Sequence, residues 1–322
     1  MALRIPFDYG FWGDYLGGQS ASLPVLPVVT DMNHRVIRIL GGNPGSMQLQ
    51  GTNTYLVGTS YQKILIDTGD GTPSWINEVI KVVSSRNIEI TAVLLTHWHG
   101  DHTGGVPDLI EYDSKIATRV FKNMPDEGQK DIRDGDIFRV EGASLRAIFT
   151  PGHAVDHMCF VLLEENALFT GDNVLGHGYS VVQDLSTYIS SLAYMSSQGC
   201  SSGYPAHGAK IDDLPKKMME YRNHKELRIN KIFTALQKSR SGQSGMTLVE
   251  IVNSIYGNMP EDVLQKALIP FLRQALTKLT EDRKIGFQLR GTAEKRYFAC
   301  TLPEQGLKVN DRIKIEVKEI LN

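Results

Sequence analysis

The sequence predicts an α/β protein in which strands form layers and helices pack outside them, followed by a smaller helical module. Short apolar runs bounded by glycine turns alternate with a helical pattern through the first part of the 322-residue chain. Hydrophobic residues make up 41% of the chain and charged residues 22%, close to the averages for globular proteins. From Lys216 onward the composition turns to helix-forming residues. This order favours one layered domain and one appended module.

The first half of the layered domain is predicted to run strand, strand, strand, helix, strand. The helix is expected at 75–83, where apolar residues recur at a helical spacing. The same order returns more loosely in the second half. The predicted strands are 35–40, 54–57, 63–66, 92–95, 145–150, 159–163 and 167–170.

The chain is predicted to contain three regions. They are an N-terminal arm (1–30), a layered domain (31–236) and a C-terminal module (246–322), with a polar linker at 238–245. The arm carries Phe11, Trp12 and Tyr15, which either pack on the body or line a substrate site. The C-terminal module is predicted to contain helices at 247–256 and 261–279 and a hairpin around Gly291, an order that resembles a winged helix.

The net charge of −2 argues against a chain that wraps duplex DNA. The charge is uneven, because residues 222–322 sum to +7 and residues 1–221 to −9. Three cysteines without a CxxC spacing do not form a disulfide framework. Neither a signal sequence nor an apolar stretch of membrane-spanning length is seen. We therefore expect a cytoplasmic protein with no membrane or DNA partner, and the sequence leaves its oligomeric state open.

The strongest chemical signal is the segment THWHGDHTGG at 96–105, directly after the predicted strand 92–95. It places four potential metal ligands within six residues, namely His97, His99, Asp101 and His102. A loop is expected here, because residues two apart on a helix do not face each other. Loops at strand ends carry the sites of α/β folds. Imidazole and carboxylate ligands suit zinc, with manganese or iron as alternatives.

The HxHxDHxGG pattern resembles the metallo-β-lactamase superfamily, and three later motifs follow in the order that this superfamily uses. The motifs are TPGH at 150–153, TGD at 170–172 and YPAHG at 204–208. The resemblance covers about residues 35–210 and implies an αββα sandwich that holds two Zn²⁺ ions. The matching positions imply one ion on His97, His99 and His153, a second on Asp101, His102 and His207, Asp172 as the bridge, and Asp101 as a catalytic residue.

Other residues near these motifs carry weaker expectations. Many members of the superfamily have glycine where this chain has Ala206, so the turn before His207 must avoid positive φ at that position. His157, together with Asp156, is expected either to orient the ligands or simply to pack. His34, His177 and His224 are expected to be ordinary surface or packing residues, and the three cysteines to be packing residues.

Two ions about 3.5 to 4 Å apart lower the pKa of a water bound between them, so the implied reaction class is hydrolysis. Finer resemblance narrows the substrate. The segments RILGGNPG (38–45) and LQGTNTYL (49–56) resemble a branch that contains a mitochondrial lactamase-like endoribonuclease and fungal polyketide-releasing thioesterases. The segment FWGDYLGGQ (11–19) resembles the fungal group, particularly the atrochrysone carboxyl carrier-protein thioesterases.

The resemblance implies a thioesterase that releases an aromatic polyketide from the acyl carrier domain of a polyketide synthase. The alternatives are a metal-dependent endoribonuclease acting on single-stranded RNA and a metal-bearing binding protein without turnover. A thiol with a pKa of about 8.5 leaves without a strong acid, whereas an RNA alkoxide benefits from one. The basic C-terminal region, including Arg273, Lys278, Arg283 and Lys284, suits either an acidic carrier domain or RNA.

Overall fold

The computed structural model describes residues 23–239, 245–290 and 294–300. The chain separates into two compact units, 1–228 and 229–322, and the division falls within the long helix α6 (Leu214–Lys238). The predicted arm residues Phe11, Trp12 and Tyr15 lie outside the described residues, as does most of the predicted linker. The predicted region boundaries stay predictions.

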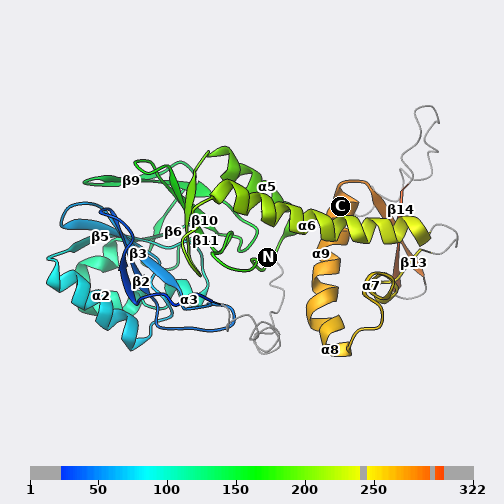
Figure 1. Cartoon of the computed structure of the whole chain (residues 1–322), viewed down its shortest axis with the longest axis horizontal. Helices are drawn as coiled ribbons and strands as arrows, with labels where there is room; N and C mark the ends of the chain where they lie inside the picture. Colours follow the sequence, from blue (N-terminus) through cyan, green and yellow to red (C-terminus); the bar gives the residue numbers. More distant parts are fainter. Residues whose placement is uncertain (1–22, 240–244, 291–293, 301–322) are drawn as a thin grey trace. The chain divides into compact units, whose positions relative to one another are not determined.

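The first unit contains two sheets (Figure 1). The strands of the first sheet follow the chain order β1 (Val29–Asp31), β2 (Val36–Leu40), β3 (Asn53–Val57), β4 (Gln62–Ile66), β5 (Glu89–Leu94), β6 (Val120–Lys122) and β7 (Lys130–Asp131). Neighbours from β1 to β4 are antiparallel, and those from β4 to β7 are parallel. The change to parallel pairing requires a crossover, which α2 (Pro73–Ser85) supplies between β4 and β5.

The second sheet has the order β12-β11-β10-β9-β8. Its strands are β8 (Ile137–Val140), β9 (Ala143–Phe149), β10 (Met158–Leu162), β11 (Ala167–Gly171) and β12 (Ser202–Pro205). The strands β8 to β11 pair antiparallel, whereas β11 and β12 are parallel because α5 (Leu185–Ser197) crosses between them. Since β11 and β12 run in the same direction, their carboxyl ends meet at one edge, where Asp172 and His207 follow them.

Three apolar layers hold the first unit together. A central layer lies between the sheets and includes Tyr55 from the first sheet and Phe169 from the second, with ring centroids 5.1 Å apart. Trp75 of α2 and Leu109 of α4 (Val106–Tyr112) belong to a second layer on the outer face of the first sheet. The third layer contains side chains of β10, β11, α5 and α6 on the outer face of the second sheet. The predicted αββα sandwich is confirmed.

Several elements of this unit were not predicted. They are β1, β6, β7, β8, β12, α4, α5 and the 3₁₀-helix η2 (Ser114–Thr118). The strands among them have two to four residues, and β7 and β8 are largely exposed, so their sequences lack the apolar runs of core strands.

The second unit shows the predicted order of helix, helix and hairpin. Helix α7 (Leu248–Tyr256) begins with a capping box formed by Thr247 and Glu250. The predicted helix at 261–279 is divided into α8 (Glu261–Val263), the π-helical turn η4 (Leu264–Leu268) and α9 (Ile269–Glu281). Pro270 explains the division, because its ring lacks an N–H and clashes with the carbonyl four residues earlier in a regular helix. Strands β13 (Ile285–Arg290) and β14 (Glu294–Ala299) form the hairpin.

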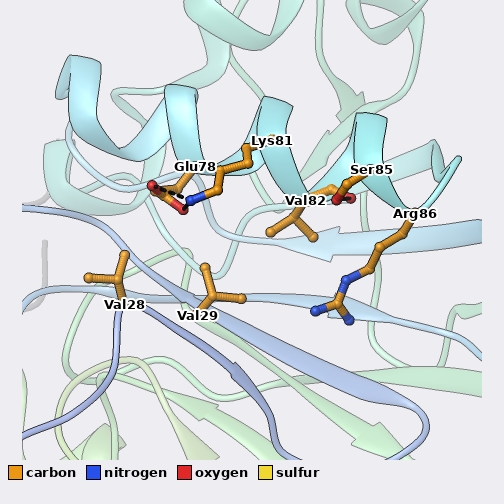
Figure 2. A pocket seen from close by; sticks show the side chains of 7 residues that line it. All are labelled: Val28, Val29, Glu78, Lys81, Val82, Ser85 and Arg86. Atoms are coloured by element: carbon orange, nitrogen blue, oxygen red, sulfur yellow. Dashed lines mark hydrogen bonds and ion pairs between the residues drawn. The ribbon is translucent and has the colours of Figure 1, made fainter.

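A surface pocket of about 440 Å³ lies between the edge strand β1 and α2 (Figure 2). Its charged residues have ion-pair partners, since Lys81 approaches Glu78 (3.4 Å) within the pocket and Arg86 contacts the nearby Asp31 (2.5 Å). None of its lining residues belongs to the predicted metal motifs. Among the described helices, none is both long enough and apolar enough to cross a membrane.

Candidate metal centre

The seven predicted ligands form two adjacent groups at the carboxyl ends of the strands. The first ligand group is His97, His99, His153 and Asp172, and the second ligand group is Asp101, His102 and His207. Within each group, one ligand atom from every residue lies within 4.8 Å of the others. The structure therefore brings together every side chain that the sequence motifs predicted.

The segment that carries the first four ligands differs from its predicted form. His97 and His99 lie on extended backbone after β5, but Asp101 and His102 lie on a single helical turn, α3 (Gly100–Thr103). The carbonyl of His99 accepts hydrogen bonds from the N–H groups of His102 and Thr103, which starts the turn. The prediction of a loop throughout was wrong at this point. The turn carries Asp101 and His102, which both belong to the second ligand group.

Hydrogen bonds fix the ring nitrogens of the first ligand group. His153 Nδ1 lies 2.7 Å from the Val181 carbonyl, which can only accept, so the proton is on Nδ1 and the Nε2 lone pair faces the site. His97 Nδ1 lies 3.0 Å from Thr96 Oγ1, whose own proton is donated to Asp67. The Nε2 lone pair of His97 is therefore also directed inward.

These two lone pairs converge on a third nitrogen. His99 Nδ1 lies 2.8 Å from His97 Nε2 and 3.1 Å from His153 Nε2. His99 Nδ1 carries at most one proton, so it cannot donate a full hydrogen bond to both His97 Nε2 and His153 Nε2. Burial, reinforced by His153, lowers the pKa of His99 to about 3, and burial lowers the pKa of His97 and His153 as well. Three neutral imidazoles that converge in this way fit a cation that accepts lone pairs.

Carboxylates surround the two histidines of the second ligand group. Burial opposes protonation of His102, but Asp101, Asp172 and Asp67 raise its pKa well above the ordinary value. Burial also opposes protonation of His207, but Asp172 and Asp101 raise the pKa of His207 to about 9. The field in this group favours positive charge, as expected where a metal ion binds.

Asp172 contacts both groups through different oxygens. Its Oδ2 lies 3.4 Å from His153 Nε2, whereas Oδ1 lies 3.2 Å from His207 Nε2 and 3.5 Å from His102 Nε2. His102 Nε2 and Asp172 Oδ1 are buried and have no hydrogen-bond partner among the described residues. Buried polar atoms of this kind need a partner. The ligand set therefore fits a divalent metal site on chemical grounds.

Partners behind the ligands hold them in place. Asp67 Oδ2 lies 2.8 Å from His102 Nδ1, and its Oδ1 accepts from the Thr96 backbone N–H at 2.8 Å. Asp67 has φ of 57°, because the chain turns sharply at the end of β4. From the sequence, the glycine-containing segment DTGDG (67–71) predicts only a turn. A carboxylate at the end of a strand was the signal that could have identified it.

His157 orients Asp172 through its backbone. Its Nε2 accepts from the Asp172 N–H at 3.1 Å, so the ring proton is on Nδ1, 3.0 Å from Thr150 Oγ1. A Cβ on Gly171 would lie 2.5 Å from His157 Nε2, so only glycine allows this approach. The buried Asp156 pairs with Lys122 at 2.9 Å. It also accepts a hydrogen bond from the backbone N–H of Trp98, the residue between His97 and His99. Of the two readings offered for His157 and Asp156, these contacts favour orientation of the ligands.

The turn that carries His207 is tied to β3. Asn53 Nδ2 donates to the carbonyls of Pro205 and Gly208, both at 2.8 Å, and the Asn53 N–H donates to the Ala206 carbonyl at 2.6 Å. Positive φ falls on Gly208, at 87°, and not on Ala206. The expectation for Ala206 is confirmed. Asn53 is a residue whose role in the site the sequence did not reveal.

Comparison with known proteins places this site in a family. A model of the metallo-beta-lactamase superfamily matches residues 48–195. Lactamase-like protein aptB of Emericella nidulans is 58% identical over 303 residues, which cover 92% of this chain and 98% of that protein. Lactamase-like protein nscB of Aspergillus fumigatus is 57% identical over 310 residues, which cover 93% and 94%. Lactamase-like protein vrtG of Penicillium aethiopicum is 54% identical, with coverage of 92% and 98%.

Solved structures share the fold at low sequence identity. A beta-lactamase domain protein from Burkholderia ambifaria matches with a TM-score of 0.71 and 17% identity, covering 86% of this chain and 95% of the other. A metallo-beta-lactamase family protein from Thermus thermophilus matches with a TM-score of 0.57 and 20% identity, covering 86% and 100%. Sequence and fold agree with the ligand geometry, and the chain belongs to the metallo-β-lactamase superfamily, with fungal lactamase-like proteins as close relatives.

Proposed function

We propose that this protein is a metal-dependent thioesterase that hydrolyses the thioester between an aromatic polyketide and the acyl carrier domain of a polyketide synthase. Membership of the superfamily supports a hydrolase. The observation that carries the proposal is Asp172, whose two oxygens face the two ligand groups. That geometry suits two divalent ions, with Zn²⁺ the first choice for imidazole and carboxylate ligands.

The roles proposed for the ligands follow the two groups. The first ligand group would hold one ion and the second would hold the other, and the carboxylate of Asp172 faces both groups. Ions bound there would polarise the thioester carbonyl and lower the pKa of the attacking water. Asp101 is 18% exposed in its side chain and lies next to His207, with Oδ2 3.4 Å from Nε2. Burial alone raises the pKa of Asp101, but His102 and His207 bring it below the ordinary value, so the carboxylate can accept a hydrogen bond from water and orient it.

The leaving group favours the thioesterase over the ribonuclease. Each of the six histidines gathered at the site already has a task, because five are ligands and both ring nitrogens of His157 are engaged. No imidazole of this cluster remains to protonate a leaving group. A thiolate leaves without protonation, since its conjugate thiol has a pKa of about 8.5, whereas an RNA alkoxide needs a proton donor.

The proposed partner is the acyl carrier domain, recruited by the basic residues of the C-terminal region. Lys278 and Lys284 both lie near Asp282, at 3.2 Å and 4.0 Å, so part of their charge is balanced locally. Arg273 and Arg283 are exposed. Reversal of these two arginines to glutamate should raise KM for a carrier-bound substrate, more strongly at low salt, and leave a small thioester mimic unaffected. Equal effects on both substrates would contradict docking.

A direct assay tests the reaction class. Purified protein is given an aromatic acyl thioester on a carrier domain and, separately, single-stranded RNA under the same Zn²⁺ conditions. We expect release of the carboxylic acid, and loss of that release in His99→Ala. RNA cleavage that disappears in His99→Ala, together with no acid release, would replace the thioesterase with the endoribonuclease.

A further inference from the structure

The loop between β11 and α5 fixes one ligand of the first ligand group. His153 Nδ1 donates to the Val181 carbonyl at 2.7 Å and lies 3.2 Å from Ser180 Oγ. The ring orientation of His153 therefore depends on where the backbone at 180–181 lies. At its far end the loop is tied to the His153 segment, because the N–H groups of Gln183 and Asp184 donate to the Gly152 carbonyl at 2.8 Å and 3.0 Å.

Helix α6 holds the middle of the same loop. Lys225 Nζ donates to the Ser180 carbonyl at 3.2 Å. Tyr221 OH donates to the Gly178 carbonyl at 2.9 Å and accepts from the Leu175 N–H at 3.0 Å. Two side chains of one helix thus fix three backbone groups of the loop.

A ring stack reinforces this attachment. The ring of Tyr179 stacks on His224 of α6, with centroids 3.9 Å apart and planes at 12°. Helix α5 contacts the same loop, because Tyr188 OH donates to the Asn173 carbonyl at 2.6 Å. The loop is therefore in contact with both α5 and α6.

Lys225 is a costly residue for this position. Its relative exposure is 5%, and burial, with Arg228 as the second cause, lowers its pKa to about 7. Burial of a lysine amine is unfavourable unless its hydrogen bonds compensate. Both the ammonium and the neutral amine carry an N–H, so the bond to the Ser180 carbonyl persists in either form.

We propose that Lys225 and Tyr221 are positioning residues for His153, acting through the backbone of Gly178 to Val181. The inference rests on the proposed metal centre. It assigns α6 a role in the site although none of its residues belongs to a ligand group. Loss of the Lys225 amine or the Tyr221 hydroxyl frees the loop. The Val181 carbonyl then no longer holds His153 Nε2 toward the other members of the first ligand group.

The test measures Zn²⁺ binding rather than turnover. Competition with a chromophoric chelator gives the dissociation constant of each ion in the wild type, Lys225→Met and Tyr221→Phe. Lys216→Met is the matched control, because it makes the same change at an exposed position of the same helix. Partners that orient a metal-binding histidine contribute about 10- to 100-fold in affinity, and for residues one step further away we expect about 3- to 10-fold.

Whether one ion or both ions bind more weakly distinguishes positioning of His153 from a general loss of rigidity in the protein. We expect weaker binding of one ion only, and in ¹¹³Cd²⁺-loaded protein a shift of one resonance, the same one that His153→Ala removes. Lys216→Met should match the wild type. Equal weakening of both ions, or affinities within twofold of wild type in both variants, would overturn the inference. If Lys225→Met fails to fold, Tyr221→Phe decides alone, and a wild type that binds no Zn²⁺ refutes the metal centre itself.

Discussion

The two halves of the metal centre are held by different kinds of partner. In the first ligand group, neutral groups fix the histidines, namely the Val181 carbonyl behind His153 and the Thr96 hydroxyl behind His97. In the second, the Asp67 carboxylate lies behind His102 and two further carboxylates surround the histidines. The histidines of the first group therefore present neutral lone pairs, whereas the surroundings of the histidines in the second group stabilise positive charge. Asp172 thus joins two sites of unequal electrostatic character.

The largest effect is expected from Asp172→Ala, because Asp172 places one carboxylate oxygen toward each half. Loss of metal catalysis removes several kcal/mol of transition-state stabilisation, so acid release should fall by about 10³-fold or more. Metal analysis should show loss from both halves, whereas His97→Ala should empty only the first. Circular dichroism checks that both variants stay folded. Full activity after exhaustive chelation would contradict the hydrolytic mechanism.

Asp67→Asn is expected to weaken the second half more than the first, because Asp67 contacts His102 directly and His97 only through Thr96. The variant keeps the shape of the side chain but removes the charge behind His102. We expect about a 10- to 100-fold loss of Zn²⁺ affinity in the second ligand group. Chelator competition measures this loss, and the ion in the first ligand group is the internal control. A loss shared equally by both ions would show that the halves are not held independently.

Asn53→Ala tests how far the second half depends on β3. The substitution leaves the carbonyls of Pro205 and Gly208 without the Asn53 amide. Each unsatisfied buried group costs about 1 to 3 kcal/mol, and we expect the free energy of unfolding to fall by about 2 kcal/mol. Urea unfolding of the chelated protein measures the change without metal. Asn223→Ala, at an exposed position of α6, is the control for amide removal and should not destabilise the protein.

The last prediction concerns pH and the support of the first half. The pKa of Lys225 is about 7 in the folded protein and 10.5 as its ordinary value, so between these values the unfolded chain binds more protons. Stability contributed by this group therefore rises as pH increases from about 7 to 10.5. The difference in unfolding free energy between wild type and Lys225→Met, measured on chelated protein, should rise over that range. A difference that is flat with pH would show that the amine is not buried as described.

Local motifs were enough to predict which side chains the fold gathers at the candidate metal centre. His97, His99, Asp101 and His102 lie within six residues, and the later candidate ligands directly follow strands or occupy recognisable motifs. Strand ends of a layered fold meet at one edge, so the rough placement of these side chains could be predicted. The long apolar strands and α2 were predicted for a similar reason, because buried elements leave a clear periodic pattern. Short edge strands such as β7 and β8 leave none.

The fold class and the side chains gathered at the candidate metal centre could be predicted from the sequence, because motif spacing and hydrophobic patterning are local features. The partners that hold each half of the candidate centre depend on tertiary packing. Asp67 lies 35 residues before His102, and Lys225 contacts Ser180 across 45 residues. No local pattern encodes such pairs, since they form only when the layers pack and bring distant hydrogen-bonding groups into the same buried space.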